Sequence, residues 1–361
     1  MNVQSGSTPA SPPAPPRPGP LPGPLGRVAA KLYSAAIARR NRAFDTGHHV
    51  ERLSVPVVSI GNVSVGGTGK SPLVAHVCRL VLEAGVRPCI AMRGYARGGA
   101  RSDEADSYER EFGDAVDIVA RADRLAGIRP LLAGTSRAPG VVVLDDGFQH
   151  RRIARNLDIV LIDVSRDPFA DRLLPAGWLR EPAGSLQRAS CVVLTHAELA
   201  PAGELDSISL NVQRVHGRSP LATTRHLWTA LRDASDKPFP LDYLMGRRII
   251  GVCAIGNPAG FVEALRLTAG DAPSSPPHEV IALPDHDPFR PAMVRRIAET
   301  ARRARAQAIV VTDKDWSKLR LLPSSTWPCA VLRPTLSLGF VNGRQAFDEA
   351  VLASLRPASG R

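Results

Sequence analysis

Residues 59–72 read SIGNVSVGGTGKSP, and they constrain the fold more than any other part of the chain. They follow an apolar run at residues 55–60 and lead into a run with helical spacing at residues 73–82. The order strand, glycine-rich turn, helix is the setting of a phosphate-binding loop. In such a loop, backbone N–H groups curl around an anion, and the N-terminus of the next helix adds partial positive charge.

The loop differs from the strict pattern G-x-x-x-x-G-K-[ST] only in that Ser64 replaces the first glycine. We expect Lys70 to reach the β- and γ-phosphates of a nucleotide and the Ser71 hydroxyl to bind Mg²⁺. A turn that is merely rich in glycine is the alternative, and the flanking strand and helix argue against it. The predicted nucleotide-binding residues are Ser64, Val65, Gly66, Gly67, Thr68, Gly69, Lys70 and Ser71.

A second apolar run, residues 141–144, ends in Asp145 and Asp146. An apolar strand that delivers an aspartate beside a phosphate loop is the Walker B arrangement, in which the carboxylate holds Mg²⁺ directly or through water. Two adjacent acids at a buried strand end are costly unless they bind a cation or pair with a base. We therefore predict that at least one of them binds metal.

Strand-like and helix-like segments alternate along the first two hundred residues, which predicts a doubly wound, mainly parallel α/β sheet covered on both faces. The alternation lapses between about residues 205 and 245, where residues 211–215 and 221–224 indicate short strands of a connector. A second, smaller α/β unit follows. The predicted divisions are a disordered proline-rich tail (1–24), a P-loop domain (25–215, completed by 338–361) and the smaller domain with its connector (216–337).

Residues 25–44 have helical spacing, with an apolar face dominated by alanine and basic residues around the rest. The helix can pack on the domain, or it can lie in a membrane surface with its basic residues near anionic headgroups. Judged from the residues alone, packing is favoured, because alanine offers little free energy of insertion.

Composition restricts the partners and the compartment. Lys and Arg number 46 against 34 Asp and Glu, a formal charge of +12 that favours anionic partners. With aromatic residues at 5% and without a recognised module, a nucleic-acid partner is not expected. Five scattered cysteines indicate neither disulfides nor a zinc site. No apolar run approaches the ~18 residues of a membrane span. No secretory signal is visible. A cytoplasmic protein is expected.

Four motifs, taken together and in order, resemble the tetraacyldisaccharide 4′-kinase family. They are the phosphate loop, residues 145–150 (DDGFQH), residues 173–182 (LLPAGWLREP) and residues 312–319 (TDKDWSKL). The resemblance implies a kinase that uses ATP and Mg²⁺ to phosphorylate the 4′-hydroxyl of a membrane-embedded disaccharide 1-phosphate precursor in lipid A biosynthesis. It also implies two α/β domains joined by a short β-ribbon, and a peripheral location at the anionic cytoplasmic face of the inner membrane. The resemblance also favours the interpretation that residues 25–44 lie in a membrane surface over the interpretation that they pack on the domain.

The resemblance also implies roles for individual residues. Asp103 would accept the proton of the attacking hydroxyl, and His286 would orient it in a dyad that forms fully when the two domains close. Taken alone, Asp103 is explained by helix-start chemistry, and His286 as a hydrogen-bonded surface group. The other catalytic residues would be Lys70 and Asp146, and the metal ligands Ser71, Asp145 and Glu181. The predicted substrate-binding residues are Asn62, Tyr95, Arg124, His150 and Arg180.

A regulatory P-loop NTPase, such as a GTPase or a metallochaperone, is the alternative. GTPases read guanine with an Asn-Lys-x-Asp segment, and the nearest run, residues 313–316, lacks the asparagine. The histidines are too dispersed along the sequence to indicate a metal-delivery site.

Overall fold

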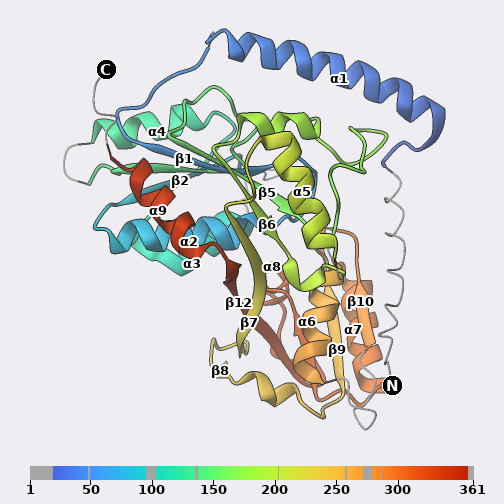
Figure 1. Cartoon of the computed structure of the whole chain (residues 1–361). Coiled ribbons are helices and arrows are strands. Elements are labelled where there is room, and N and C mark those ends of the chain that lie inside the picture. Colours follow the sequence, from blue (N-terminus) through green and yellow to red (C-terminus); the bar gives the residue numbers. More distant parts are fainter. Residues whose placement is uncertain are drawn as a thin grey trace, which may run out of the picture.

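The strands form one twelve-stranded sheet in the computed structural model, which describes residues 19–47, 49–94, 103–134, 137–201, 203–256, 258–270, 279–285 and 287–356 (Figure 1). The strand order is β10-β9-β11-β12-β7-β6-β5-β1-β4-β2-β3, with β8 paired to β7. The strands are β1 (Val57–Asn62), β2 (Pro88–Met92), β3 (Asp117–Ala120), β4 (Val141–Asp145), β5 (Leu157–Asp163), β6 (Cys191–Thr195), β7 (Ala222–Arg232), β8 (Pro238–Phe239), β9 (Ile249–Cys253), β10 (Glu279–Ala282), β11 (Ala308–Val311) and β12 (Ala330–Asn342). The α-helices are α1 (Gly23–Asp45), α2 (Lys70–Glu83), α3 (Asp103–Phe112), α4 (Arg124–Ala133), α5 (Glu204–His216), α6 (Pro258–Ala269), α7 (Pro291–Arg303), α8 (Asp313–Leu319) and α9 (Arg344–Ser354).

The first lobe, β1–β6 with α1–α5 and α9, is built on parallel strands. Strands β1, β4, β5 and β6 are buried along their whole length, as strands covered on both faces must be. Apolar residues of α2, α3 and α9 pack on one face, and those of α4 and α5 pack on the other. The predicted doubly wound sheet is confirmed.

The second lobe, β9–β11 with α6–α8, is a smaller parallel unit. Helix α6 packs on one of its faces, and α7 and α8 pack on the other. The long antiparallel pair β7 and β12 connects the lobes, and β12 also pairs in parallel with β11. The mainly parallel sheet and the second α/β unit agree with the prediction, while the domain boundaries at residues 24, 215 and 337 stay predictions.

One predicted strand is wrong. Residues 211–215 lie within α5, where Ile208 and Val212 are buried four residues apart on the same side of the helix. Acidic residues in its first turn and Gly217, with φ 85°, beyond its last turn favour the helix. The β-branched valines of this segment made it resemble a strand.

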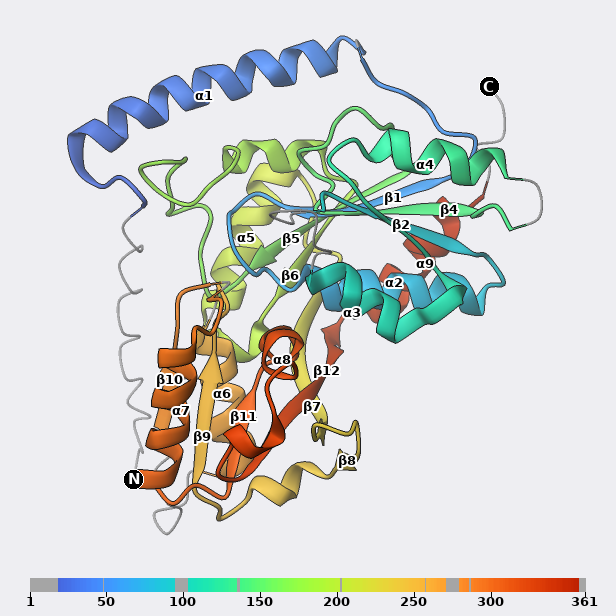
Figure 2. The same cartoon turned by 180° about the vertical axis from the view of Figure 1, so that it is seen from behind.

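Helix α1 runs along the outer side of the first lobe in both views (Figures 1 and 2). Its Tyr33 hydroxyl donates to the carbonyl of Arg180, 3.0 Å away, and Ile37 is buried. Leu25, Val28 and Leu32 of the same helix are 76%, 59% and 70% exposed. Within the described ranges, every helix is either too short or too polar to span a membrane.

Candidate active site

The glycine-rich loop leaves β1 at Asn62 and enters α2 at Lys70. Gly66 and Gly69 have φ values of 119° and 75°, which side-chain-bearing residues rarely adopt. The Val65 N–H donates to the Trp178 carbonyl at 2.8 Å, and the Thr195 hydroxyl donates to the Thr68 carbonyl at 3.0 Å. The loop is therefore held from two sides before any ligand binds.

Lys70 brings the loop and the aspartate pair together. Strand β4 pairs with β1 so that Asp145 lies opposite Ile60, which puts the end of β4 beside the start of the loop. The Lys70 Nζ lies 3.6 Å from Asp146 Oδ1 and 3.4 Å from Asn62 Oδ1. The two predicted features thus meet at the same edge of the sheet, the carboxyl end of the parallel strands, where ligands bind in folds of this kind.

Asp145 is buried, and the Tyr108 hydroxyl donates to its Oδ2 at 3.0 Å. Burial, and then the negative charge of Glu104, raises the pKa of the Asp145 carboxyl to about 6, although Lys70 opposes this. The Ser71 side chain lies near the Tyr108 hydroxyl. A hydroxyl and an under-compensated buried carboxylate are oxygen ligands of the kind that Mg²⁺ prefers, so these residues fit the predicted metal site.

Asp146 has a different environment. Burial alone would raise the pKa of its carboxyl, but Lys70 and Arg180 outweigh this effect and lower the pKa. The Arg180 Nη1 lies 2.8 and 2.7 Å from the two Asp146 oxygens, and Arg124 donates to the Asp146 carbonyl at 3.2 Å. Asp146 therefore organises the cations Lys70, Arg180 and Arg124 around the end of β4.

His150 ends the DDGFQH run. Burial, followed by the charges of Arg124 and Arg155, lowers the pKa of its imidazole to about 4. His150 Nε2 is buried and lacks a hydrogen-bond partner among the described residues. The neutral ring beside several arginines leaves this nitrogen free to face a ligand.

Glu181 links the proline loop to α1. It is fully buried, with Oε1 3.1 Å from Arg40 and Oε2 within 3.0 Å of both Asn41 and Arg188. Both carboxylate oxygens therefore already have protein partners.

The remaining predicted residues are only partly described. Asp103 is the first residue of α3, so the structure places its backbone but not its side chain. Tyr95 and His286 lie outside the described residues.

The second lobe approaches the loop through the turn after β9. Arg166, beside Gly66, donates to the Gly256 carbonyl of this turn at 2.7 Å. Helix α3 meets α8 across the lobes, where Arg110 and Asp313 form an ion pair of 3.2 Å (Figure 2). The site thus lies where the two lobes meet.

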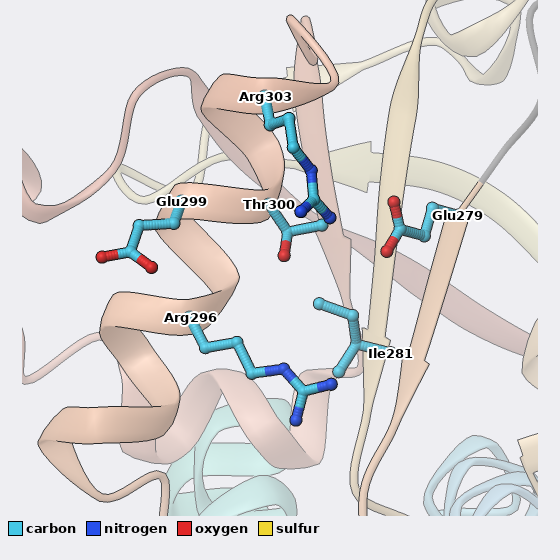
Figure 3. A pocket seen from close by; sticks show the side chains of 6 residues that line it. All are labelled: Glu279, Ile281, Arg296, Glu299, Thr300 and Arg303. Carbon is cyan, nitrogen blue, oxygen red and sulfur yellow. The ribbon is translucent and has the colours of Figure 1, made fainter.

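A separate cavity of about 470 Å³ lies between β10 and α7 in the second lobe (Figure 3). Its lining residues are Glu279, Ile281, Arg296, Glu299, Thr300 and Arg303. None of these is a predicted site residue.

Sequence reasoning missed two residues of the site. Tyr108 shares the buried face of α3 with Ala105, and this spacing could have shown that it points inward but not that it would reach Asp145. Gln149 donates to the Asn62 carbonyl at 2.9 Å and accepts from Arg180 at 3.5 Å. It lies within the DDGFQH run, so the motif itself was its signal.

A phosphate-binding loop whose lysine faces an aspartate pair at the edge of a parallel sheet defines a P-loop protein of the nucleotide-dependent phosphotransfer class. The family model described as tetraacyldisaccharide-1-P 4′-kinase matches residues 24–356. The chain therefore belongs to the tetraacyldisaccharide 4′-kinase family. The prediction of a transferase, a kinase of lipid A biosynthesis, is confirmed, and the regulatory NTPase is not favoured.

Individual relatives agree with the family model. The tetraacyldisaccharide 4′-kinase of Anaeromyxobacter dehalogenans strain 2CP-C is 36% identical over 307 residues, covering 80% of this chain and 79% of the relative. That of Chlorobaculum parvum is 30% identical and covers 91% of this chain and 94% of the relative. The crystal structure of the "apo" form of LpxK from Aquifex aeolicus in complex with ATP has a TM-score of 0.65 and 26% identity, covering 91% of this chain and 97% of that one.

Proposed function

We propose that the protein transfers the γ-phosphoryl group of ATP to the 4′-hydroxyl of tetraacyldisaccharide 1-phosphate at a membrane surface. The observation that carries this proposal is the position of Lys70, 3.6 Å from Asp146 at the first turn of the helix that follows the glycine loop. The ATP complex of the Aquifex aeolicus relative supports ATP as the phosphoryl donor.

Charge neutralisation is the main contribution expected of the loop. The transition state of phosphoryl transfer spreads negative charge over the γ-phosphoryl oxygens, so positioning and electrostatics dominate catalysis. Lys70 would exchange its contact with Asp146 for a phosphate oxygen, and Asp146 would keep Arg180 as its partner. The backbone N–H groups of residues 64–69 would bind the remaining phosphate oxygens.

Ser71 and Asp145 are the residues best suited to hold Mg²⁺. When bound, the ion would neutralise charge on the β- and γ-phosphate oxygens. Tyr108 orients the Asp145 carboxylate from α3. Glu181, the third predicted ligand, would have to leave Arg40 and Arg188 to bind metal.

Proton transfer is assigned to Asp103, with His286 as the group that orients it. Helix α3 carries Asp103 at its start and Tyr108 one and a half turns later. Because Tyr108 hydrogen-bonds Asp145, this one helix would connect the proton acceptor Asp103 to the proposed metal ligand Asp145. Asp285, next to His286 in the chain, pairs with Lys314 of α8, and α8 contacts α3. Closure of the lobes would complete the dyad.

The acceptor lipid would bind near the cations around Asp146. Arg124 and Arg180 offer positive charge, and Asn62, Tyr95 and His150 are the other predicted contacts. The acyl chains of the substrate remain in the membrane, which α1 would touch through Leu25, Val28 and Leu32. The family resemblance supports the proposal that this membrane surface is the cytoplasmic face of the inner membrane.

Replacing Lys70 tests the proposed donor site. We expect Lys70→Met to lower the rate of lipid phosphorylation by about 10²–10³-fold, because a charge aimed at the transition state is lost. The matched control is Lys237→Met, at an exposed lysine of the connector. Activity of the Lys70 variant close to that of the control would show that the loop does not act as proposed.

A further inference from the structure

Three residues that the proposed kinase mechanism does not use gather behind the phosphate loop. His196 follows β6, Glu198 lies in the short 3₁₀ helix that follows it, and His226 lies on β7. Each offers one ligand atom, and these atoms lie within 4.8 Å of one another. In the part of the chain that the structure describes, this is the one group of histidine, cysteine and acidic residues arranged in this way.

Two imidazole nitrogens in this group are buried without a hydrogen-bond partner. His196 is 6% exposed, and the Nε2 atoms of His196 and His226 have no hydrogen-bond partner among the described residues. The Gly67 backbone lies near the His196 ring, but outside good hydrogen-bond geometry. A buried polar atom without a hydrogen-bond partner is destabilising, and a metal ion bound to both nitrogens would satisfy them.

The remaining contacts pre-organise the group. His196 Nδ1 lies 3.2 Å from Glu198 Oε1, and the His226 backbone N–H donates to Glu198 Oε2 at 3.1 Å. The two imidazole rings meet edge to face with their centroids 4.3 Å apart. Glu198 thus fixes both histidines relative to its own carboxylate.

We propose that His196, Glu198 and His226 form a binding site for a divalent transition-metal ion of the zinc class. Two imidazoles and one carboxylate are a ligand set that zinc accepts, with a fourth position left for water. Mg²⁺ prefers oxygen ligands and near-ideal octahedral geometry, so this site differs in chemistry from the one at Ser71 and Asp145. Two ligands on a tetrahedral zinc ion lie about 3.4 Å apart, so small side-chain rotations suffice to close the site.

The site would stiffen the phosphate loop from behind. A Cβ atom on Gly69 would lie 2.8 Å from His226 Nε2, so the loop and this ring are already in contact. Thr195, the neighbour of His196, donates to the Thr68 carbonyl. A bound ion would fix both histidines and, through them, the rear of residues 67–69.

Metal titration of the tag-free full-length protein tests the proposal. After treatment with a chelator and dialysis, Zn²⁺ is added in competition with a chromophoric chelator. We expect one equivalent to bind to the wild type, and His196→Gln or His226→Gln to weaken binding at least tenfold. The matched control is His76→Gln, because His76 pairs with the Asp348 carboxylate at 2.8 Å outside the group. The control is expected to bind Zn²⁺ like the wild type.

Cobalt substitution gives a second readout that does not depend on the variants folding. Co²⁺ bound to the wild type is expected to show the intense visible absorption of a four-coordinate site, and Zn²⁺ is expected to abolish it. A weak six-coordinate spectrum, or less than one equivalent of Zn²⁺ on the wild type, would overturn the proposal. Wild-type affinity in folded His196→Gln/His226→Gln protein would overturn it as well.

Discussion

Asp145 and Asp146 are chemically identical neighbours that the fold places in opposite electrostatic environments. Asp145 is buried beside the hydroxyl of Tyr108 and the negative charge of Glu104, whereas Asp146 faces Lys70 and Arg180. Burial without enough positive charge raises one pKa, and two cations lower the other. The pair therefore divides into a carboxylate without enough nearby positive charge, which we propose binds Mg²⁺, and one that already pairs with cations.

Asp145→Asn is expected to stabilise the metal-free protein while it destroys activity. The folded pKa of about 6 exceeds the unfolded value of 3.8, so the wild type loses stability as pH rises between these values. At pH 7.5 the variant avoids the buried charge, and we expect a gain of about 1–3 kcal/mol in the free energy of unfolding. Denaturant unfolding at pH 4 and pH 7.5 measures this gain. A variant less stable than the wild type at pH 7.5 would show that the buried Asp145 carboxylate does not destabilise the metal-free protein.

Glu181 attaches α1 to the proline loop through Arg40 and Asn41. Glu181→Gln removes the charge that faces Arg40 and Arg188, and we expect it to lower the free energy of unfolding by about 1–3 kcal/mol. If Glu181 instead acts mainly as the predicted metal ligand, the variant will need more Mg²⁺ for half-maximal activity and will unfold like the wild type. Thermal unfolding and a Mg²⁺ titration of activity together separate the two roles.

Among the helices and strands, those that are fully buried were the easiest to predict from the sequence, because they are continuous apolar runs. Strands β1 and β4 are apolar runs, and each was predicted close to its observed position. Residues 330–342 were not predicted as a strand, because Arg333 and Pro334 interrupt the apolar run. Arg333 is nevertheless buried, because Asp313 and Asp236 pair with it.

Helix α8 was not predicted from the sequence either. Residues 312–319 were recognised as a family motif, and in the structure Thr312 caps a helix there by accepting from the Asp315 N–H at 3.1 Å. The acids after Thr312 are first-turn residues of this helix. Local capping chemistry was readable from the sequence, and the tertiary pairing of Asp313 was not.

Helix α1 leaves three apolar side chains exposed, and we expect them to contact the membrane. Leu25→Ser, Val28→Ser and Leu32→Ser, combined, should weaken sedimentation with anionic lipid vesicles by tenfold or more, because each exposed side chain contributes about 1.5–3 kcal/mol when buried in an apolar environment. Leu321→Ser is the matched control, since Leu321 is 78% exposed in the second lobe. Activity on detergent-dispersed substrate should persist in the triple variant. Equal sedimentation of the triple variant and the control would exclude α1 as the membrane contact.

At the scale of the whole molecule, the long β7–β12 pair explains why the site could be predicted only in part. The motifs identified the loop and the aspartate pair because each is contiguous in sequence. The contacts of Arg166 with Gly256 and of Arg110 with Asp313 depend on how β7 and β12 place the second lobe. The same applies to His196 and His226, which are distant in sequence and which adjacent strands bring together.

In the proposed reaction, the loop at Lys70 and the aspartate at the end of β4 jointly hold a metal-bound triphosphate and pass its terminal phosphoryl group to an acylated sugar. Its most direct test is mass spectrometry of tetraacyldisaccharide 1-phosphate after incubation with the purified protein, ATP and Mg²⁺. We expect a product heavier by one phosphoryl group, carried on the 4′-oxygen and absent when ATP or Mg²⁺ is omitted. Hydrolysis of ATP that leaves the lipid mass unchanged would contradict it.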